Sequence, residues 1–190
     1  ADILRPIFEN ESIAKVGQNI KFDILVIKKY GIHVAGQLFD TMIAHYLLNP
    51  ELRHGMDYLA ETYLKYKTVP IESLIGPKGK KQLSMRDIPV EQVAEYAAED
   101  ADVTLKLKNY FAPLLKQEEI ETLFYDIEMP LVPVLAYMER NGVCVDTEAL
   151  KETSRHFTAR MKQIEEERFS RLIMMPTALL RRPSKKQCEI

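Results

Sequence analysis

The chain of 190 residues is 46% hydrophobic and 28% charged, with a formal net charge of −2. This excludes an intrinsically disordered protein and leaves room for one domain or parts of two. Its two cysteines, Cys144 and Cys188, exclude a disulfide framework and a zinc site, so a reducing compartment is expected. No apolar run approaches the roughly 20 residues that cross a bilayer, and the first residues do not resemble a signal peptide, so a cytoplasmic protein without a membrane partner is expected.

Apolar periodicity in the first 66 residues predicts helices separated by short extended segments. In chain order, the expected elements are a helix over 2–10, an extended piece over 14–17, a helix over 20–30, a strand over 32–38, and helices over 41–48 and 56–66. Gly31 is expected to end the second helix, and Asp40 followed by Thr41 to cap the third.

The rest of the chain reads as a loop followed by long helices. Residues 68–89 are rich in proline and glycine and are expected to be mostly loop. In the expected helix over 90–111, apolar residues repeat every four positions (Val93, Ala97, Ala101 and Leu105), and Pro113 should break it. A second long helix is expected over 117–141, bent or offset at Pro130 and Pro133, and a third from Asp146 to about residue 168. From 169 onward the periodicity is lost.

Two short acidic motifs lie far apart in this chain. They are Asn19-Ile20-Lys21-Phe22-Asp23 and Tyr96-Ala97-Ala98-Glu99-Asp100. Residues four apart share one face of a helix, so each motif offers a carboxylate with a polar partner beside it. Two acidic groups from distant segments suit a site that holds divalent metal against a phosphodiester. Either spacing alone arises by chance in any acidic helix.

In this order, within VGQNIKFD and EYAAEDADVTLKL, the motifs resemble the second and third exonuclease motifs of the proofreading domain of the bacterial DNA polymerase I family (family A). The likeness covers residues 3–167. It is also carried by LFDTMIAHYLLNPELRHGMDYLAE and by IEMPLVPVLAYMERNGVCVDTEAL, a block that resembles the start of the polymerase thumb. The first motif of the family, an upstream Asp-x-Glu, is missing. Asp146-Thr147-Glu148 matches the Asp-x-Glu pattern, but it follows the third motif instead of preceding the second, and it is interpreted as a helix cap.

The resemblance implies an α/β fold, specifically part of a ribonuclease-H-like (DnaQ-like) 3′-5′ exonuclease domain over 1–115. The beginning of the polymerase domain, with thumb helices, would follow over 116–168, and a divergent tail over 169–190. The parent would be a DNA-directed DNA polymerase with 3′-5′ proofreading. The start of the chain looks like that of a fragment, which alone is expected to be inactive. A stand-alone DnaQ-like or ribonuclease-D-like exonuclease and a catalytically dead DNA-binding module stay open as alternatives.

The resemblance also implies roles for individual residues. Asp100 would bind the first of two Mg²⁺ or Mn²⁺ ions and Asp23 the second, more loosely held one, in a site that is incomplete in this chain. Tyr96 would orient the attacking water. Hard cations prefer carboxylate oxygen, which agrees with these ligand types. Asp40 is interpreted as a cap in preference to a ligand.

A path for the substrate strand follows from the same resemblance. Gln18 and Asn19 would touch the 3′-terminal nucleotides, Arg53 would approach the strand, and Ile71 occupies a position where the family often has an aromatic. The implied partners are a single-stranded 3′ end and primer-template DNA, and the parent is expected to be a monomer. The GPKGKK loop (76–81) contacts phosphate or is merely solvated. Glu99 and Asp102 are expected to be solvated. His45 and His54 are expected to have packing or surface roles.

Overall fold

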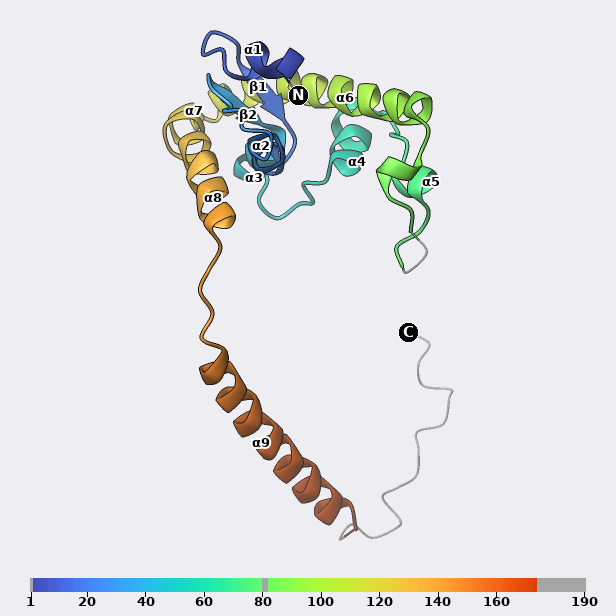
Figure 1. The fold of residues 1–190 in the computed structure, drawn as a ribbon, viewed down its shortest axis with the longest axis vertical. Helices are drawn as coiled ribbons and strands as arrows, with labels where there is room; N and C mark the ends of the chain where they lie inside the picture. Colours follow the sequence, from blue (N-terminus) through green and yellow to red (C-terminus); the bar gives the residue numbers. More distant parts are fainter. Residues whose placement is uncertain (1, 80–81, 174–190) are drawn as a thin grey trace. The chain divides into compact units, whose positions relative to one another are not determined.

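The structure, a computed structural model, describes residues 2–79 and 82–173. The chain divides into two units, Ala1–Gly142 and Val143–Ile190, and each is described by itself (Figure 1). Lys80 and Lys81 of the GPKGKK loop and most of the expected tail, 174–190, lie outside the described residues. No described helix combines the length and the apolar composition that a membrane span needs.

The first unit is mostly helical with one small sheet. Its elements are η1 (Asp2–Leu4), α1 (Arg5–Phe8), β1 (Lys15–Gly17), α2 (Ile20–Lys28), β2 (Leu38–Asp40), α3 (Thr41–Leu48), α4 (Met56–Leu59), η2 (Ala60–Leu64), α5 (Glu72–Ile75), η3 (Met85–Asp87), α6 (Val90–Gln117), α7 (Glu121–Leu123), η4 (Phe124–Glu128) and α8 (Met129–Asn141). Of these, η2 and η4 are π-helical. Apart from α5 and η3, the described residues of this region (68–79 and 82–88) form no regular helix or strand, as their proline and glycine content predicts.

The two strands pair in parallel, with Lys15 opposite Leu38 and Gly17 opposite Asp40. The strand expected over 32–38 is therefore wrong in its bounds, because β2 begins at Leu38. Gly36 has a φ of +86°, and a Cβ there would lie 2.7 Å from the Ile13 carbonyl oxygen. This left-handed residue packs against the segment that precedes β1 and interrupts the extended backbone.

The predicted break at Pro113 is also wrong, since α6 continues through it to Gln117. Pro113 lies on the exposed side of α6, where water can hydrate the carbonyl group that loses its N–H donor. On the opposite side, Phe111 and Leu115 are fully buried and fix the helix before and after the proline. Packing therefore outweighs the intrinsic cost of proline at this position.

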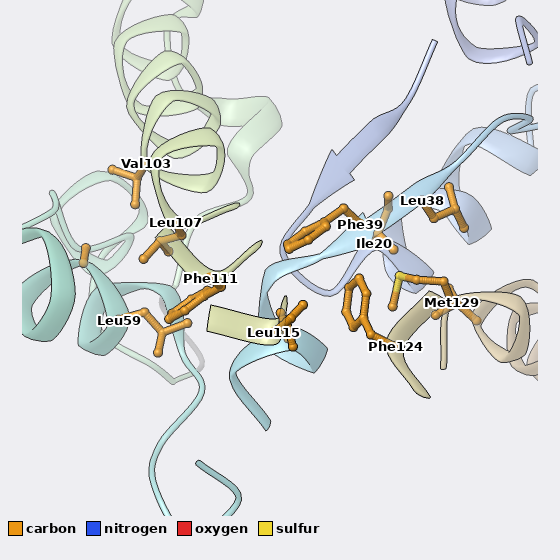
Figure 2. Close-up of a cluster of buried hydrophobic side chains, with 13 residues drawn as sticks. Ile20, Leu38, Phe39, Leu59, Val103, Leu107, Phe111, Leu115, Phe124 and Met129 are labelled. Carbon is orange, nitrogen blue, oxygen red and sulfur yellow. The ribbon is translucent and has the colours of Figure 1, made fainter. Parts of the chain in front are cut away.

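A single apolar cluster holds the first unit together (Figure 2). It joins Leu59, Leu107, Phe111 and Leu115 to Phe39, Phe124 and other buried side chains of β2, η4 and α8. The rings of Phe39 and Phe124 lie 4.8 Å apart. The core thus runs without interruption from α6 into η4 and α8, and burial of each large side chain contributes on the order of 2 kcal/mol.

In the second unit the described structure is one helix, α9 (Thr147–Ile173). The Asp146 carboxylate accepts hydrogen bonds from the backbone N–H groups of Glu148 (3.1 Å) and Ala149 (3.0 Å). This confirms that Asp146 is a helix cap, and capping accounts for the Asp-x-Glu pattern at 146–148.

Candidate active site

Asp23 lies on α2, one turn after a strained residue. Asn19 precedes the helix with φ 60° and ψ 48°, a left-handed conformation that few residues other than glycine tolerate. Its side chain is exposed and makes no cap hydrogen bond. Backbone strain of this kind is often kept at functional sites. The exposed Asn19 amide is therefore available to a ligand at the start of α2.

The amides at the start of α2 are satisfied by Asp40. Its carboxylate accepts from the N–H groups of Asn19 (3.2 Å) and Ile20 (2.7 Å), and also from Met42 (2.8 Å) and Ile43 (3.3 Å) at the start of α3. Asp40 is 1% exposed. Burial raises the pKa of its carboxyl group, while these hydrogen bonds act in the opposite direction. Asp40 therefore caps both α2 and α3, of which the sequence predicts only the cap of α3. Both carboxylate oxygens are occupied by backbone N–H groups.

Tyr96 and Asp100 lie one turn apart on α6. Burial raises the pKa of Tyr96 to about 12, and the charge of Asp100 and its hydrogen bond to the phenol add to this effect. The phenol is thus neutral at physiological pH. Burial also raises the pKa of Asp100, although the hydrogen bond from Tyr96 acts against it. The nearby charge of Asp57 raises both pKa values further, a neighbour that no spacing in the sequence indicates.

The two acidic motifs meet at one cavity of about 550 Å³. Asp23 and Gln18 line it from α2 and the turn before it, and Asp100 lines it from α6. Burial raises the pKa of Asp23, followed by the charge of Asp40. Raised pKa values at both carboxylates mean that desolvation makes their charges costly without a cation. Ala101 and Leu105, which the sequence assigns to a packed face, also line this cavity, and both are exposed.

The carboxylates at the cavity are of the type that binds divalent metal. Asp23 and Asp100 offer the hard oxygen donors that Mg²⁺ and Mn²⁺ prefer. Across residues 2–79 and 82–173, however, no group of three or more histidine, cysteine or acidic side chains is arranged to hold a metal ion. The chemistry of the donors therefore fits, while two carboxylates occupy only a minority of a six-coordinate shell.

Of the residues expected to touch DNA, Gln18 lines the cavity, whereas Asn19, Arg53 and Ile71 do not. Gln18 lines it, but its amide is already bound: Nε2 donates to the His54 carbonyl oxygen at 2.7 Å, and Oε1 accepts from the Thr41 hydroxyl. One amide hydrogen remains free for a ligand. Arg53 is exposed next to His54 and does not line the cavity.

Ile71 lies outside the cavity as well, at the start of α5 and 37% exposed. The segment that leads to it is bound to α6 by Glu99. The Glu99 carboxylate accepts from the Tyr66 hydroxyl at 2.6 Å and from the Val69 N–H at 2.9 Å. The expectation that Glu99 is merely solvated is wrong, because a partner distant in sequence lies across from it. Asp102 forms an exposed ion pair with Lys106.

The packing role expected for His45 is confirmed. The side chain is fully buried, and its imidazole lies 5.5 Å from the Phe111 ring. Burial, followed by the nearby His54, lowers the pKa of His45 to about 4. The imidazole is therefore neutral in the folded protein at physiological pH.

Comparison with known proteins shows the family of this chain. A family model for the 3′-5′ exonuclease of DNA polymerase A matches residues 1–116. DNA polymerase I from Pseudomonas aeruginosa is 44% identical over 172 residues, which cover 87% of this chain and 18% of that protein. DNA polymerase I from Chloroflexus aurantiacus is 43% identical over 166 residues, covering 86% of this chain and 17% of that protein. The chain thus spans less than a fifth of these curated relatives.

A solved structure has a similar fold. It is the POL domain of Pol1 from M. smegmatis in complex with a DNA primer-template and dNTP. The TM-score is 0.62 at 20% sequence identity, and the match covers 94% of this chain and 29% of that chain. At this identity the likeness shows the fold alone.

Proposed function

The chain belongs to the 3′-5′ exonuclease family of DNA polymerase A, and we propose that it is part of a DNA polymerase I that copies a template and removes mismatched 3′ ends. The observation that carries this proposal is that Asp23 and Asp100 line one cavity, with Tyr96 one helical turn before Asp100 on α6. In this proposal residues 1–115 belong to the exonuclease domain and 116–168 to the beginning of the polymerase domain. No function is assigned to 169–190.

The proposed reaction is hydrolysis of the terminal phosphodiester at a 3′ end. Asp100 and Asp23 would hold a pair of Mg²⁺ or Mn²⁺ ions, which when bound supply charge stabilisation on the attacking and leaving oxygens. Tyr96, with a pKa of about 12, is a neutral phenol at neutral pH. It therefore orients the attacking water and does not remove its proton.

The proposed strand path runs over the turn before α2. Asn19 presents an exposed amide there, and Gln18 has one amide hydrogen left for a nucleotide. Arg53 would meet a phosphate, and Ile71 would contact the unpaired strand. The proposed partners are a single-stranded 3′ end for this part and primer-template DNA for the parent, with the parent as a monomer.

Two alternatives are weaker. A stand-alone DnaQ-like or ribonuclease-D-like exonuclease does not account for the similarity to DNA polymerase I over 87% of the chain, which extends beyond the family match at residue 116. A DNA-binding module without chemistry is favoured only by the small number of carboxylates at the cavity. That alternative and the main proposal differ in whether the cavity binds divalent cation.

Titration of the purified chain with Mn²⁺, followed by paramagnetic broadening of backbone amides, tests this difference. We expect weak binding, with broadening centred on residues beside Asp23 and Asp100, because two carboxylates complete only part of a coordination shell. Asp100→Asn should abolish it. Asp102→Asn on the same helix, whose carboxylate is exposed and paired with Lys106, is the matched control. Tight binding of two ions, or broadening unaffected by Asp100→Asn, would contradict the assignment.

A further inference from the structure

Gln18, which lines the cavity, is part of a ring of hydrogen-bonded side chains. Its Oε1 accepts from the Thr41 hydroxyl, and its Nε2 donates to the His54 carbonyl oxygen at 2.7 Å. A carbonyl oxygen can only accept, so the amide nitrogen of Gln18 must face His54. Both ends of the amide are therefore fixed, and with them the direction of its remaining N–H.

The His54 side chain is held in turn by His45. The two Nδ1 atoms lie 2.7 Å apart, and Nε2 of His45 lies 2.9 Å from the Tyr63 hydroxyl. Thr41 and His45 are four residues apart on α3, so they lie on the same face of that helix. The ring of contacts closes through α3: Thr41 binds Gln18, Gln18 binds His54, and His54 binds His45.

His45 connects this ring to the core. It is fully buried, with ring centroids 5.3 Å from Tyr63 and 5.5 Å from Phe111. Residues 49–55 link α3 to α4 without regular helix or strand and include the exposed Arg53. This segment is hydrogen-bonded to α3 at both ends, through the Asn49 N–H to the His45 carbonyl oxygen (2.8 Å) and through the His54 side chain, and His54 also binds Gln18. The position of the end of this segment, at Arg53 and His54, therefore depends on the buried imidazole of His45.

The short contact between the two imidazoles also restricts their protonation. At 2.7 Å there is room for one hydrogen between the nitrogens, so one Nδ1 must act as the acceptor. The polar groups that face His45 are His54, on one side, and Tyr63 on the other, and Asn49 also donates to the Tyr63 hydroxyl. Within the described residues, no carboxylate is hydrogen-bonded to His45, His54 or Tyr63.

We propose that His45 and His54 are positioning residues for the substrate strand. Through the His54 carbonyl they fix the Gln18 amide at the cavity, and they fix the backbone from which Arg53 extends. The inference rests on the proposed function, because it treats Gln18 and Arg53 as DNA contacts. Neither histidine lines the cavity, so both would act on the strand through their neighbours.

The side-chain NH₂ resonances of Gln18 test the positioning role without DNA. In His54→Ala, we expect these resonances to shift and their hydrogens to exchange faster. His54→Gln, which can still hydrogen-bond to His45, should restore them in part. His33→Ala is the matched control, because His33 is an exposed histidine outside the ring. If His54→Ala fails to fold, His45→Asn tests the same expectation from the other side of the contact.

Binding of a fluorescent single-stranded oligonucleotide then tests the effect on the strand. His54→Ala should weaken binding roughly three- to tenfold, the range expected for one misplaced hydrogen-bonding contact, with partial rescue by His54→Gln. Unchanged Gln18 resonances in His54→Ala and His45→Asn would overturn the inference. Shifted resonances with unchanged affinity would overturn the link to the strand. Absence of binding by the unmodified chain would contradict the proposed function, while the Gln18 resonances would still decide the positioning role.

Discussion

The two halves of α6 have opposite surroundings. In the first half, Tyr96 and Asp100 are half-buried, Asp100 lines the cavity, and Ala97 and Ala101 are exposed. In the second half, a side chain is buried about every four residues, namely Val103, Leu107, Phe111 and Leu115. One helix thus carries the candidate chemistry at one end and the core at the other (Figure 2 shows the packed end).

The difference shows how an open site can still be positioned accurately. A substrate needs access to Tyr96 and Asp100, so that half of α6 cannot be covered by apolar packing. Glu99 provides polar contacts there, binding Tyr66 and Val69. The packed half fixes the helix axis, and helix stiffness carries this position to the open half. Stability and function are therefore expected to depend on different halves of the same helix.

The largest effect expected at the open half is the lack of exonuclease activity in this chain alone. Asp23 and Asp100 are two of the carboxylates that a metal pair needs, and groups that act as a unit fail together. Incubation of a 5′-labelled oligonucleotide with the purified chain and Mg²⁺ or Mn²⁺ should give no steady 3′ shortening. Shortening that disappears in Asp100→Ala would contradict this, and Asp57, whose charge raises the pKa of Asp100, would be the next carboxylate to test.

At the packed half, truncation of Phe111 should have the largest effect on stability. Phe111 is fully buried and contacts His45 and Tyr63. We expect Phe111→Ala to lower the free energy of unfolding by about 3–5 kcal/mol. Leu105→Ala is the matched control at the edge of the open half, because Leu105 is 51% exposed, and it should cost less than about 1 kcal/mol. Urea unfolding of both variants measures the difference, and equal losses would break the distinction between the halves.

The packed half should also respond to acid through His45. Its pKa is about 4 in the folded chain and 6.5 for an ordinary histidine. The unfolded chain therefore takes up the proton first as the pH falls. Stability is fully present above pH 6.5 and is lost between pH 6.5 and 4, by about 3 kcal/mol in total. Urea unfolding at several pH values should show this slope.

The variant His45→Gln should remove most of that slope, because it removes the titrating group. His33→Gln should leave it unchanged, since the His33 side chain is exposed. The raised pKa values of Asp23 and Asp100 act with the opposite sign, since the folded chain takes up those protons first as the pH falls. A slope that persists in His45→Gln would show that another group, and not the packed histidine, controls acid sensitivity.

The sequence predicted best what depends on neighbouring residues. The caps at Asp40 and Asp146 follow from an acidic residue just before a predicted helix, and both are present. The family resemblance, carried by ordered motifs, is confirmed by the match over 1–116. The convergence of Asp23 and Asp100 on one cavity agrees with those motifs, although their metal and catalytic roles remain proposals.

The sequence failed where distant contacts decide. Pro113 does not end α6, because Phe111 and Leu115 are buried on the other side of the helix. Glu99 binds Tyr66 and Val69, which no local pattern indicates. The contact between His45 and His54 is equally invisible, since nine residues separate them. At Pro113 tertiary packing outweighs local propensity, and the other contacts join residues whose proximity depends on the folded structure.

The smallest expected effect concerns Arg53 and the strand path. Arg53 is exposed and lies outside the cavity, so its contribution would be one phosphate contact. We expect the chain to bind single-stranded DNA weakly, with an affinity that falls as salt rises. Arg53→Ala should weaken binding a few-fold at low salt and reduce the slope of log affinity against log salt by about one. Fluorescence anisotropy over a series of salt concentrations measures both.

Arg140→Ala is the control for this measurement, because Arg140 is an exposed arginine of α8 that lines a separate, largely apolar pocket. Removing its charge changes the net charge of the chain equally, so it separates a local contact from a general electrostatic effect. Equal weakening by Arg53→Ala and Arg140→Ala would mean that binding follows net charge alone. In that case the strand would not pass the segment before α4, and the open half of α6 would have to be reached from another side.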